Sequence, residues 1–201
     1  VAALLTACTG MDALVHAIEA IVSTANSPIT DVHAFAAIGL IRRNLENVLL
    51  RPDDLELRNR LMLGSLEAGL AFSNASLGAV HAMAHSLGGQ LDLPHGEANA
   101  ILLNHVIAIN YASACERYDA VGEALGLKLT VLPASERLRL ILEDISGFKK
   151  SLGITATLRD KGANKDDIGH LAENALKDAC MVTNPRLASK RDIEVIYEEA
   201  L

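Results

Sequence analysis

The chain has 201 residues, of which 50% are hydrophobic, and a formal net charge of −7. A chain of this length can bury one substantial hydrophobic core. Nucleic-acid-binding domains combine a basic face with aromatic residues for stacking, whereas this chain is acidic, contains 3% aromatic residues and lacks tryptophan. It also has no run of roughly 18 apolar residues, so no membrane span is predicted. These properties argue against nucleic acid and membrane as partners.

The three cysteines, Cys8, Cys115 and Cys180, are widely spaced and form no Cys-x-x-Cys motif. An odd number of distant cysteines predicts reduced, mostly buried thiols and a cytoplasmic protein rather than a disulfide framework. The chain begins at Val1 in an apolar segment that lacks the basic leader of a signal peptide. We therefore expect it to be a piece of a longer protein, cut upstream.

The apolar residues repeat with a helical period from the beginning of the chain. Leu14, Ile18 and Ile21 belong to an apolar stripe that predicts a helix over residues 11–23, with Thr9-Gly10 directly before its start. Later helices are punctuated by proline, glycine and acidic first turns. They are predicted over residues 30–48, 54–74, 77–87, 97–110, 112–125, 135–152, 166–180 and 189–201.

Two details of this pattern bear on the site. Gly88-Gly89 is expected to end a helix, so that residues 90–96 form a loop that contains His95. Residues 128–132 (KLTVL) are the only strand-like segment, and they are expected to link helices. The sequence therefore predicts an all-α fold, a bundle-like single domain over residues 1–201.

Five side chains could form a metal site: Asp12, His16, His81, His85 and His95. The first two and the next two are pairs at i,i+4 spacing, which places each pair on one face of a helix. Imidazole and carboxylate groups together suit a divalent metal such as Fe(II) or Zn(II). An open coordination position could then polarise a substrate oxygen. Spacing alone leaves open that these residues form ordinary ion pairs or packing contacts.

Other catalytic motifs do not fit. A zincin requires glutamate directly after its first histidine, whereas Ala82 follows His81. The chain contains no His-Asp dipeptide of the kind typical of helical metal phosphohydrolases, no Gly-x-Ser-x-Gly and no Walker phosphate loop.

Residues 10–19 (GMDALVHAIE) and 78–89 (GAVHAMAHSLGG) resemble the two signatures of the iron-containing (group III) alcohol dehydrogenases. The second signature continues in residues 93–100 (LPHGEANA), and the similarity extends to residues 184–186 (NPR). The resemblance implies the helical C-terminal metal-binding domain of the dehydroquinate synthase-like fold. It also implies that the N-terminal α/β domain, which binds NAD(P) in this family, is absent from this chain.

The resemblance assigns roles to individual residues. It implies that the metal ligands are Asp12, His16, His81 and His95. It implies that His85 is a catalytic histidine near the nicotinamide, and that Leu5 and Phe72 line the cofactor. One position departs from the family, which usually has proline where this chain has Asn104. We expect this difference to affect helix geometry rather than chemistry.

The implied activity is reversible hydride transfer between a small alcohol and NAD or NADP, with Fe(II) or Zn(II) at the substrate oxygen. The isolated chain is expected to be inactive. A homodimer is a possible assembly. The alternatives are a maleylacetate reductase or a glycerol dehydrogenase-type enzyme on the same fold. Glycerol dehydrogenases typically lack a histidine at the position of His16. A helical binding module without a metal is the alternative from a different class.

Overall fold

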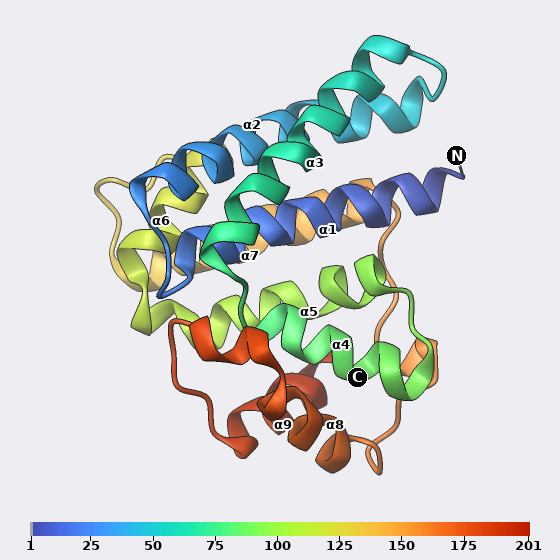
Figure 1. The fold of residues 1–201 in the computed structure, drawn as a ribbon, viewed down its shortest axis with the longest axis vertical. Coiled ribbons are helices and arrows are strands. Elements are labelled where there is room, and N and C mark those ends of the chain that lie inside the picture. The colour runs from blue at the N-terminus through green and yellow to red at the C-terminus, as the bar shows by residue number, and fades with distance from the viewer. Residues whose placement is uncertain (1) are drawn as a thin grey trace.

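The computed structural model describes residues 2–201, and this part of the chain contains nine α-helices, three short 3-10 helices and no strand (Figure 1). The α-helices are α1 (Ala3–Val22), α2 (Pro28–Leu50), α3 (Leu55–Ala75), α4 (Ala79–Leu91), α5 (His95–Asn110), α6 (Cys115–Ala124), α7 (Ala134–Ser151), α8 (Ile168–Lys177) and α9 (Lys190–Ala200). The 3-10 helices are η1 (Tyr111–Ser113), η2 (Arg159–Lys161) and η3 (Ala179–Thr183). The all-α prediction is confirmed.

Helix α1 lies at the centre of the molecule. It packs against the hairpin of α2 and α3 on one side and against α5 on the other. Helix α4 packs between α5 and α8, and α9 packs against both α8 and α5. Figure 1 shows the α2–α3 hairpin at one end of the molecule and α8 and α9 at the other. The helices that carry the candidate site, α1, α4 and α5, therefore meet in the middle.

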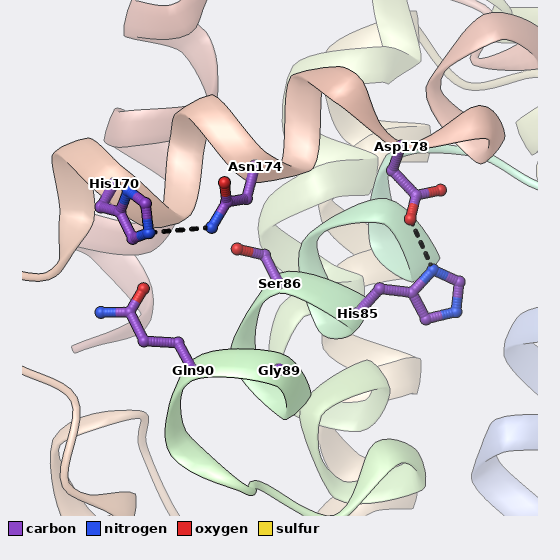
Figure 2. A pocket seen from close by; sticks show the side chains of 7 residues that line it. All are labelled: His85, Ser86, Gly89, Gln90, His170, Asn174 and Asp178. Carbon is purple, nitrogen blue, oxygen red and sulfur yellow. Dashed lines mark hydrogen bonds and ion pairs between the residues drawn. The ribbon is translucent and has the colours of Figure 1, made fainter.

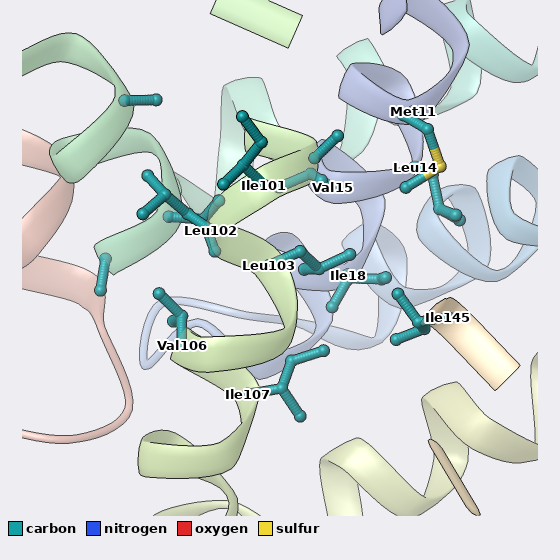
Figure 3. Packing of buried hydrophobic residues seen from close by; sticks show 14 of the residues in the cluster. Met11, Leu14, Val15, Ile18, Ile101, Leu102, Leu103, Val106, Ile107 and Ile145 are labelled. Carbon is teal, nitrogen blue, oxygen red and sulfur yellow. The ribbon is translucent and has the colours of Figure 1, made fainter. Parts of the chain in front are cut away.

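The hydrophobic core joins α1 to α5. Ile18 of α1 and Leu103 of α5 are buried in the same cluster and lie side by side in Figure 3. Helix α1 is long and apolar enough to cross a membrane by length and composition, but 78% of its most apolar window is buried inside the fold. It also contains Asp12 and His16, two ionisable residues of the candidate site. Its apolar character is that of a core helix.

The first helix is longer than predicted, because α1 begins at Ala3 rather than near Met11. Thr9 and Gly10 were expected to precede the helix, but both lie within it. The Thr9 hydroxyl donates to the carbonyl oxygen of Leu5, one turn earlier, at 2.8 Å. A Cβ at Gly10 would lie 2.5 Å from Cδ1 of Leu45. The glycine therefore allows α1 and α2 to approach closely, and it does not mark the start of a helix.

The predicted loop over residues 90–96 is wrong at both ends. Helix α4 continues through Gly88 and Gly89 to Leu91 and ends where Asp92 adopts a left-handed conformation, with φ of 53°. Helix α5 begins at His95, directly after Pro94. His95 is therefore the first residue of a helix and not a loop residue. This placement holds its backbone fixed beside α1.

Other boundaries agree more closely with the sequence. Helix α9 begins close to its predicted start, where Ser189 and Asp192 form a capping box. The predicted helix over residues 166–180 is divided into α8 and η3, because Asp178 has an extended backbone and caps the 3-10 helix through the N–H of Cys180. The three cysteines, all within residues 2–201, are free thiols.

Candidate metal centre

Four of the predicted site residues converge from three helices. Asp12 and His16 project from one face of α1, His81 from α4 and His95 from the first turn of α5. One candidate ligand atom from each residue lies within 4.8 Å of those of the other three. Oxygens of Asp12 lie 3.7 Å from His16 Nδ1, 3.7 Å from His81 Nε2 and 3.5 Å from His95 Nε2. Residues separated by up to 83 positions in the chain thus form one cluster.

The donor set fits a divalent transition metal. Three imidazoles and one carboxylate are the ligands that iron(II) and zinc(II) accept in proteins. The cluster lies at the junction of three helices, where His81 is buried and the side chains of the other three residues are partly exposed. A site of this kind is held by rigid helices and has an open approach for a substrate.

The protonation states of three of these side chains favour metal binding. Burial, assisted by the nearby His81, lowers the pKa of His16 to about 4, so its imidazole is neutral at neutral pH. Burial also lowers the pKa of His95. Burial alone would raise the pKa of Asp12, but the interactions with His81, His16 and Asn99 outweigh it and lower that pKa. A neutral imidazole and an ionised carboxylate are the forms that coordinate metals.

His81 differs from the other histidines of the cluster. Burial opposes its protonation, but the adjacent carboxylates of Asp12 and Glu19 raise its pKa to about 9. The Asp12 oxygen is 3.7 Å from Nε2, beyond hydrogen-bond distance, so its effect is Coulombic. Glu19 Oε2 is 2.6 Å from the other ring nitrogen, Nδ1. A metal at Nε2 therefore competes with a proton for that atom.

Asn99 is a polar residue of the cluster that the sequence did not single out. Its side chain is completely buried, and Nδ2 lies 2.5 Å from Asp12 Oδ1 and 3.1 Å from Nε2 of both His81 and His95. The amide oxygen has no hydrogen-bond partner within residues 2–201. The only sequence signal is that Asn99 follows His95 by four residues on the same helix, which places the two side chains on one face.

His85 lies beside this cluster but outside it. Its ring stacks on that of His95, with centroids 5.3 Å apart and planes 14° apart. Its Nδ1 is 2.8 Å from Asp178 Oδ2. Figure 2 shows the ring turned toward Asp178 and away from His170 and Asn174, which line the rest of an open pocket of about 430 Å³. Nδ1 is engaged by the carboxylate, and 44% of the side chain is exposed to solvent.

Asp178 could not be found from spacing, because it is 93 residues from His85 and lies between α8 and η3. Burial alone would raise the pKa of Asp178, but hydrogen bonds from the backbone N–H of Cys180 and from His85 outweigh it and lower that pKa. Asp178 is thus an ionised partner for the His85 ring.

The two predicted cofactor-lining residues occupy different places. Phe72, in the last turn of α3, stacks on His16 with ring centroids 4.3 Å apart and ring planes 17° apart. It therefore covers one side of the cluster. Leu5 lies seven residues before Asp12 on α1, about two helical turns away, and is 55% exposed. The structure brings Phe72, but not Leu5, into contact with the candidate ligands.

The sequence also matches a known family over nearly its whole length. The profile of the C-terminal part of the Fe-containing alcohol dehydrogenase family matches residues 6–201. The chain belongs to this family. Residues 6–201 correspond to the C-terminal part of its members.

Several individual members of the iron-containing alcohol dehydrogenase family are similar to this chain over nearly its whole length. The 1,3-propanediol dehydrogenase of Klebsiella pneumoniae is 42% identical over 98% of this chain and 51% of its own length. The NAD-dependent methanol dehydrogenase of Bacillus methanolicus is 36% identical over 98% of the chain and 52% of its own length. A crystal structure of a 1,3-propanediol oxidoreductase superposes with a TM-score of 0.96 at 42% identity, covering 100% of this chain and 53% of that one. The chain thus spans about half the length of these relatives.

Proposed function

We propose that this chain is the metal-binding catalytic part of an NAD(P)-dependent dehydrogenase that interconverts small alcohols with aldehydes or ketones. The observation that carries the proposal is the convergence of Asp12, His16, His81 and His95, whose candidate ligand atoms lie within 4.8 Å of one another. The similarity to dehydrogenases of 1,3-propanediol and methanol supports a small alcohol as substrate.

The four converging side chains would hold Fe(II) or Zn(II). When bound, such an ion supplies Lewis acidity that polarises the substrate oxygen. The three helices hold these side chains in a rigid frame, so the site would need little rearrangement when it positions the substrate oxygen. Phe72 lies against His16 and would shield this face of the cluster from water.

His85 would move the proton. In alcohol oxidation the carbinol carbon loses a hydride to C4 of the nicotinamide and the hydroxyl group loses a proton, giving a carbonyl compound, NAD(P)H and a proton. Asp178 engages Nδ1 of His85 at 2.8 Å, which leaves Nε2 free to accept that proton. The partly exposed ring can then release it to solvent.

The nucleotide-binding part would come from outside these 201 residues, because the chain spans about half the length of its relatives. Phe72 and Leu5 would face the nicotinamide end of the cofactor. The isolated chain is expected to have no dehydrogenase activity, since half of the cofactor site is missing. Measurable turnover by the 201 residues alone would contradict this expectation. A cytoplasmic location and a homodimer remain predictions.

The activity can be tested by joining the chain to the nucleotide-binding half of the Klebsiella pneumoniae 1,3-propanediol dehydrogenase. After loading with Fe²⁺, this protein should reduce NAD⁺ or NADP⁺ with 1,3-propanediol or another small primary alcohol. The His81→Ala/His95→Ala double variant should lose both the metal and the activity. Activity that survives in the metal-free double variant would contradict the proposal.

Two enzymes on the same fold are the competing candidates. His16 lies in the cluster, which disfavours a glycerol dehydrogenase-type site. The choice of substrate distinguishes a maleylacetate reductase from an alcohol dehydrogenase. If the chain belongs to a maleylacetate reductase, the joined protein should turn over maleylacetate faster than simple aldehydes. If the chain were a helical binding module without a metal, replacing His81 and His95 would lower its stability and leave its metal content unchanged.

A further inference from the structure

Glu19 is a buried carboxylate beside the candidate metal centre. It lies on α1, one turn beyond His16, and is only 3% exposed. Its oxygens contact the start of α4 and the ring of His81, 62 residues away in the chain. Burying a carboxylate is costly unless it is paired and hydrogen-bonded. The surroundings of Glu19 must therefore compensate for this cost.

The N-terminus of α4 supplies that compensation. Glu19 accepts hydrogen bonds from the backbone N–H of Gly78 at 3.1 Å and of Val80 at 2.7 Å. The N-cap residue of α4 is Gly78, which has no side chain that could accept hydrogen bonds from these groups. The positive end of the helix dipole also favours a negative charge there. Gly78 leaves the necessary space, because a Cβ at this position would lie 3.0 Å from Glu19 Oε1.

The same carboxylate determines the state of the His81 ring. Glu19 Oε2 lies 2.6 Å from His81 Nδ1, so this nitrogen donates its hydrogen to the carboxylate. The opposite atom, Nε2, faces the cluster, where it lies 3.1 Å from Asn99 Nδ2 and 3.7 Å from Asp12 Oδ1. Metal-binding histidines are commonly held in this way, with a carboxylate on the nitrogen that does not bind the metal.

We propose that Glu19 is a positioning residue for the metal centre. It holds the hydrogen of His81 on Nδ1 and orients Nε2 toward the cluster, and it thereby sets the affinity of the site for a divalent metal. This inference rests on the proposed function, because it requires that His81 binds the metal. Glu19 does not touch substrate, and its effect acts through His81.

The alternative is that Glu19 only caps α4. Asn184 separates the two roles, because its Oδ1 accepts a hydrogen bond from the N–H of Ala79 at 3.1 Å, at the same helix end. Within residues 2–201, the Asn184 side chain forms no hydrogen bond to the His81 ring, and its other partners are Asn110 and the backbone of Arg186. Asn184→Ala therefore weakens the capping of α4 and leaves the Glu19–His81 contact in place.

The test is a Co²⁺ titration, followed by the visible absorption of the bound ion, of the wild-type chain, Glu19→Gln and Asn184→Ala. Thermal unfolding in the presence of a chelator reports the stability of each protein without metal. A glutamine side chain has one acceptor oxygen, whereas the carboxylate has two. In Glu19→Gln the amide therefore cannot accept both the hydrogen of His81 Nδ1 and the hydrogens of the backbone N–H groups. We expect its Co²⁺ affinity to fall about 10- to 100-fold, whereas Asn184→Ala should lower the unfolding temperature and retain the wild-type affinity.

Each outcome decides the matter. If Glu19→Gln and the wild-type chain bind Co²⁺ with equal affinity, the role of Glu19 is wrong but the proposed function stands. The same holds if Glu19→Gln and Asn184→Ala lose equal affinity. Absence of Co²⁺ binding by the wild-type chain would overturn the proposed function and the inference with it. If Glu19→Gln does not fold, Gly78→Ala provides the same test. Its Cβ would lie 3.0 Å from both Glu19 Oε1 and Asn184 Oδ1, and Asn184→Ala controls for the second contact. The Co²⁺ affinity of Gly78→Ala should fall in the same direction as that of Glu19→Gln, and further than that of Asn184→Ala.

Discussion

Gly96 lies directly against the backbone of Cys8, so that a Cβ at Gly96 would be 2.5 Å from the Cys8 carbonyl oxygen and 3.3 Å from Cβ of Asp12. Cys8 lies one turn before Asp12 on α1, and Gly96 directly follows His95 at the start of α5. This close approach of two helix backbones therefore sets the separation of Asp12 and His95. A glycine is required here by space, not by conformation.

Gly96→Ala should separate α5 from α1 at the candidate metal centre. We expect the free energy of unfolding to fall by about 1–3 kcal/mol, as for other overpacked interiors, and the Co²⁺ affinity to fall with it. The matched control is Gly89→Ala, since nothing lies within 4 Å of a Cβ at this helical position. Gly89→Ala should stabilise the protein by roughly 0.5–1 kcal/mol. Equal stability of the two variants in chemical denaturation would contradict this account.

Asp178 should affect turnover without affecting metal content. In the protein joined to a nucleotide-binding half, Asp178→Ala should lower kcat about 10-fold, because His85 loses the partner that fixes its ring. Asp178→Asn retains an acceptor for Nδ1–H and should recover most of the loss. Metal content, measured by atomic absorption, should be the same in all three proteins. A kcat that is unchanged in Asp178→Ala would show that the contact does not serve the reaction.

Lys149 should make stability depend on pH. Burial lowers the pKa of Lys149 to about 8 from 10.5, and its Nζ donates to the Ala100 carbonyl oxygen at 2.9 Å. Between pH 8 and 10.5 the unfolded chain binds more protons at this group than the folded chain does, so the stability due to this group rises with pH.

Lys149→Met removes the titrating group and provides the comparison. The difference in unfolding free energy between Lys149→Met and the wild-type chain should change by roughly 2–3 kcal/mol from pH 7 to pH 10.5, in favour of the wild-type chain at high pH. Urea denaturation at several pH values measures this difference. A constant difference across this interval would rule out the effect.

Asn104 stands where the family usually has proline, and the structure shows what it does instead. Its Nδ2 donates to the Leu142 carbonyl oxygen at 2.8 Å and to Ser146 Oγ at 2.9 Å, both on α7. Asn104→Ala should therefore cost about 1–2 kcal/mol of stability and leave the Co²⁺ affinity unchanged. A loss of metal affinity as large as that of Glu19→Gln would place Asn104 in the site and contradict this view.

The helical period predicted most of the fold, because apolar residues recur at helical spacing along most of the chain. The starting point of α1 was missed because Thr9 and Gly10 resemble a helix start in sequence. In the structure, Gly10 serves a contact with Leu45 on another helix. Similarly, Gly88 and Gly89 suggested a helix end, whereas the left-handed backbone of Asp92 ends the helix. Local patterns do not reveal which glycines are required by packing.

The candidate site was predictable where its residues lie one helical turn apart. Asp12 and His16 form one such pair and His81 and His85 another. His95 was a third-segment candidate, to which the family resemblance gave the role of a ligand. The supporting residues were not found: Glu19 contacts His81 across 62 residues, and Asp178 contacts His85 across 93. These contacts depend on how helices pack against each other, which spacing within one helix cannot express.

The most direct test of the account is metal analysis of the chain, purified anaerobically after expression with iron, beside the His81→Ala/His95→Ala double variant. The cluster of Asp12, His16, His81 and His95 predicts near-stoichiometric iron or zinc in the wild-type chain and little in the variant. Circular dichroism should show that both proteins are helical. Equal metal content in the two folded proteins would contradict the assignment of this cluster as the metal centre.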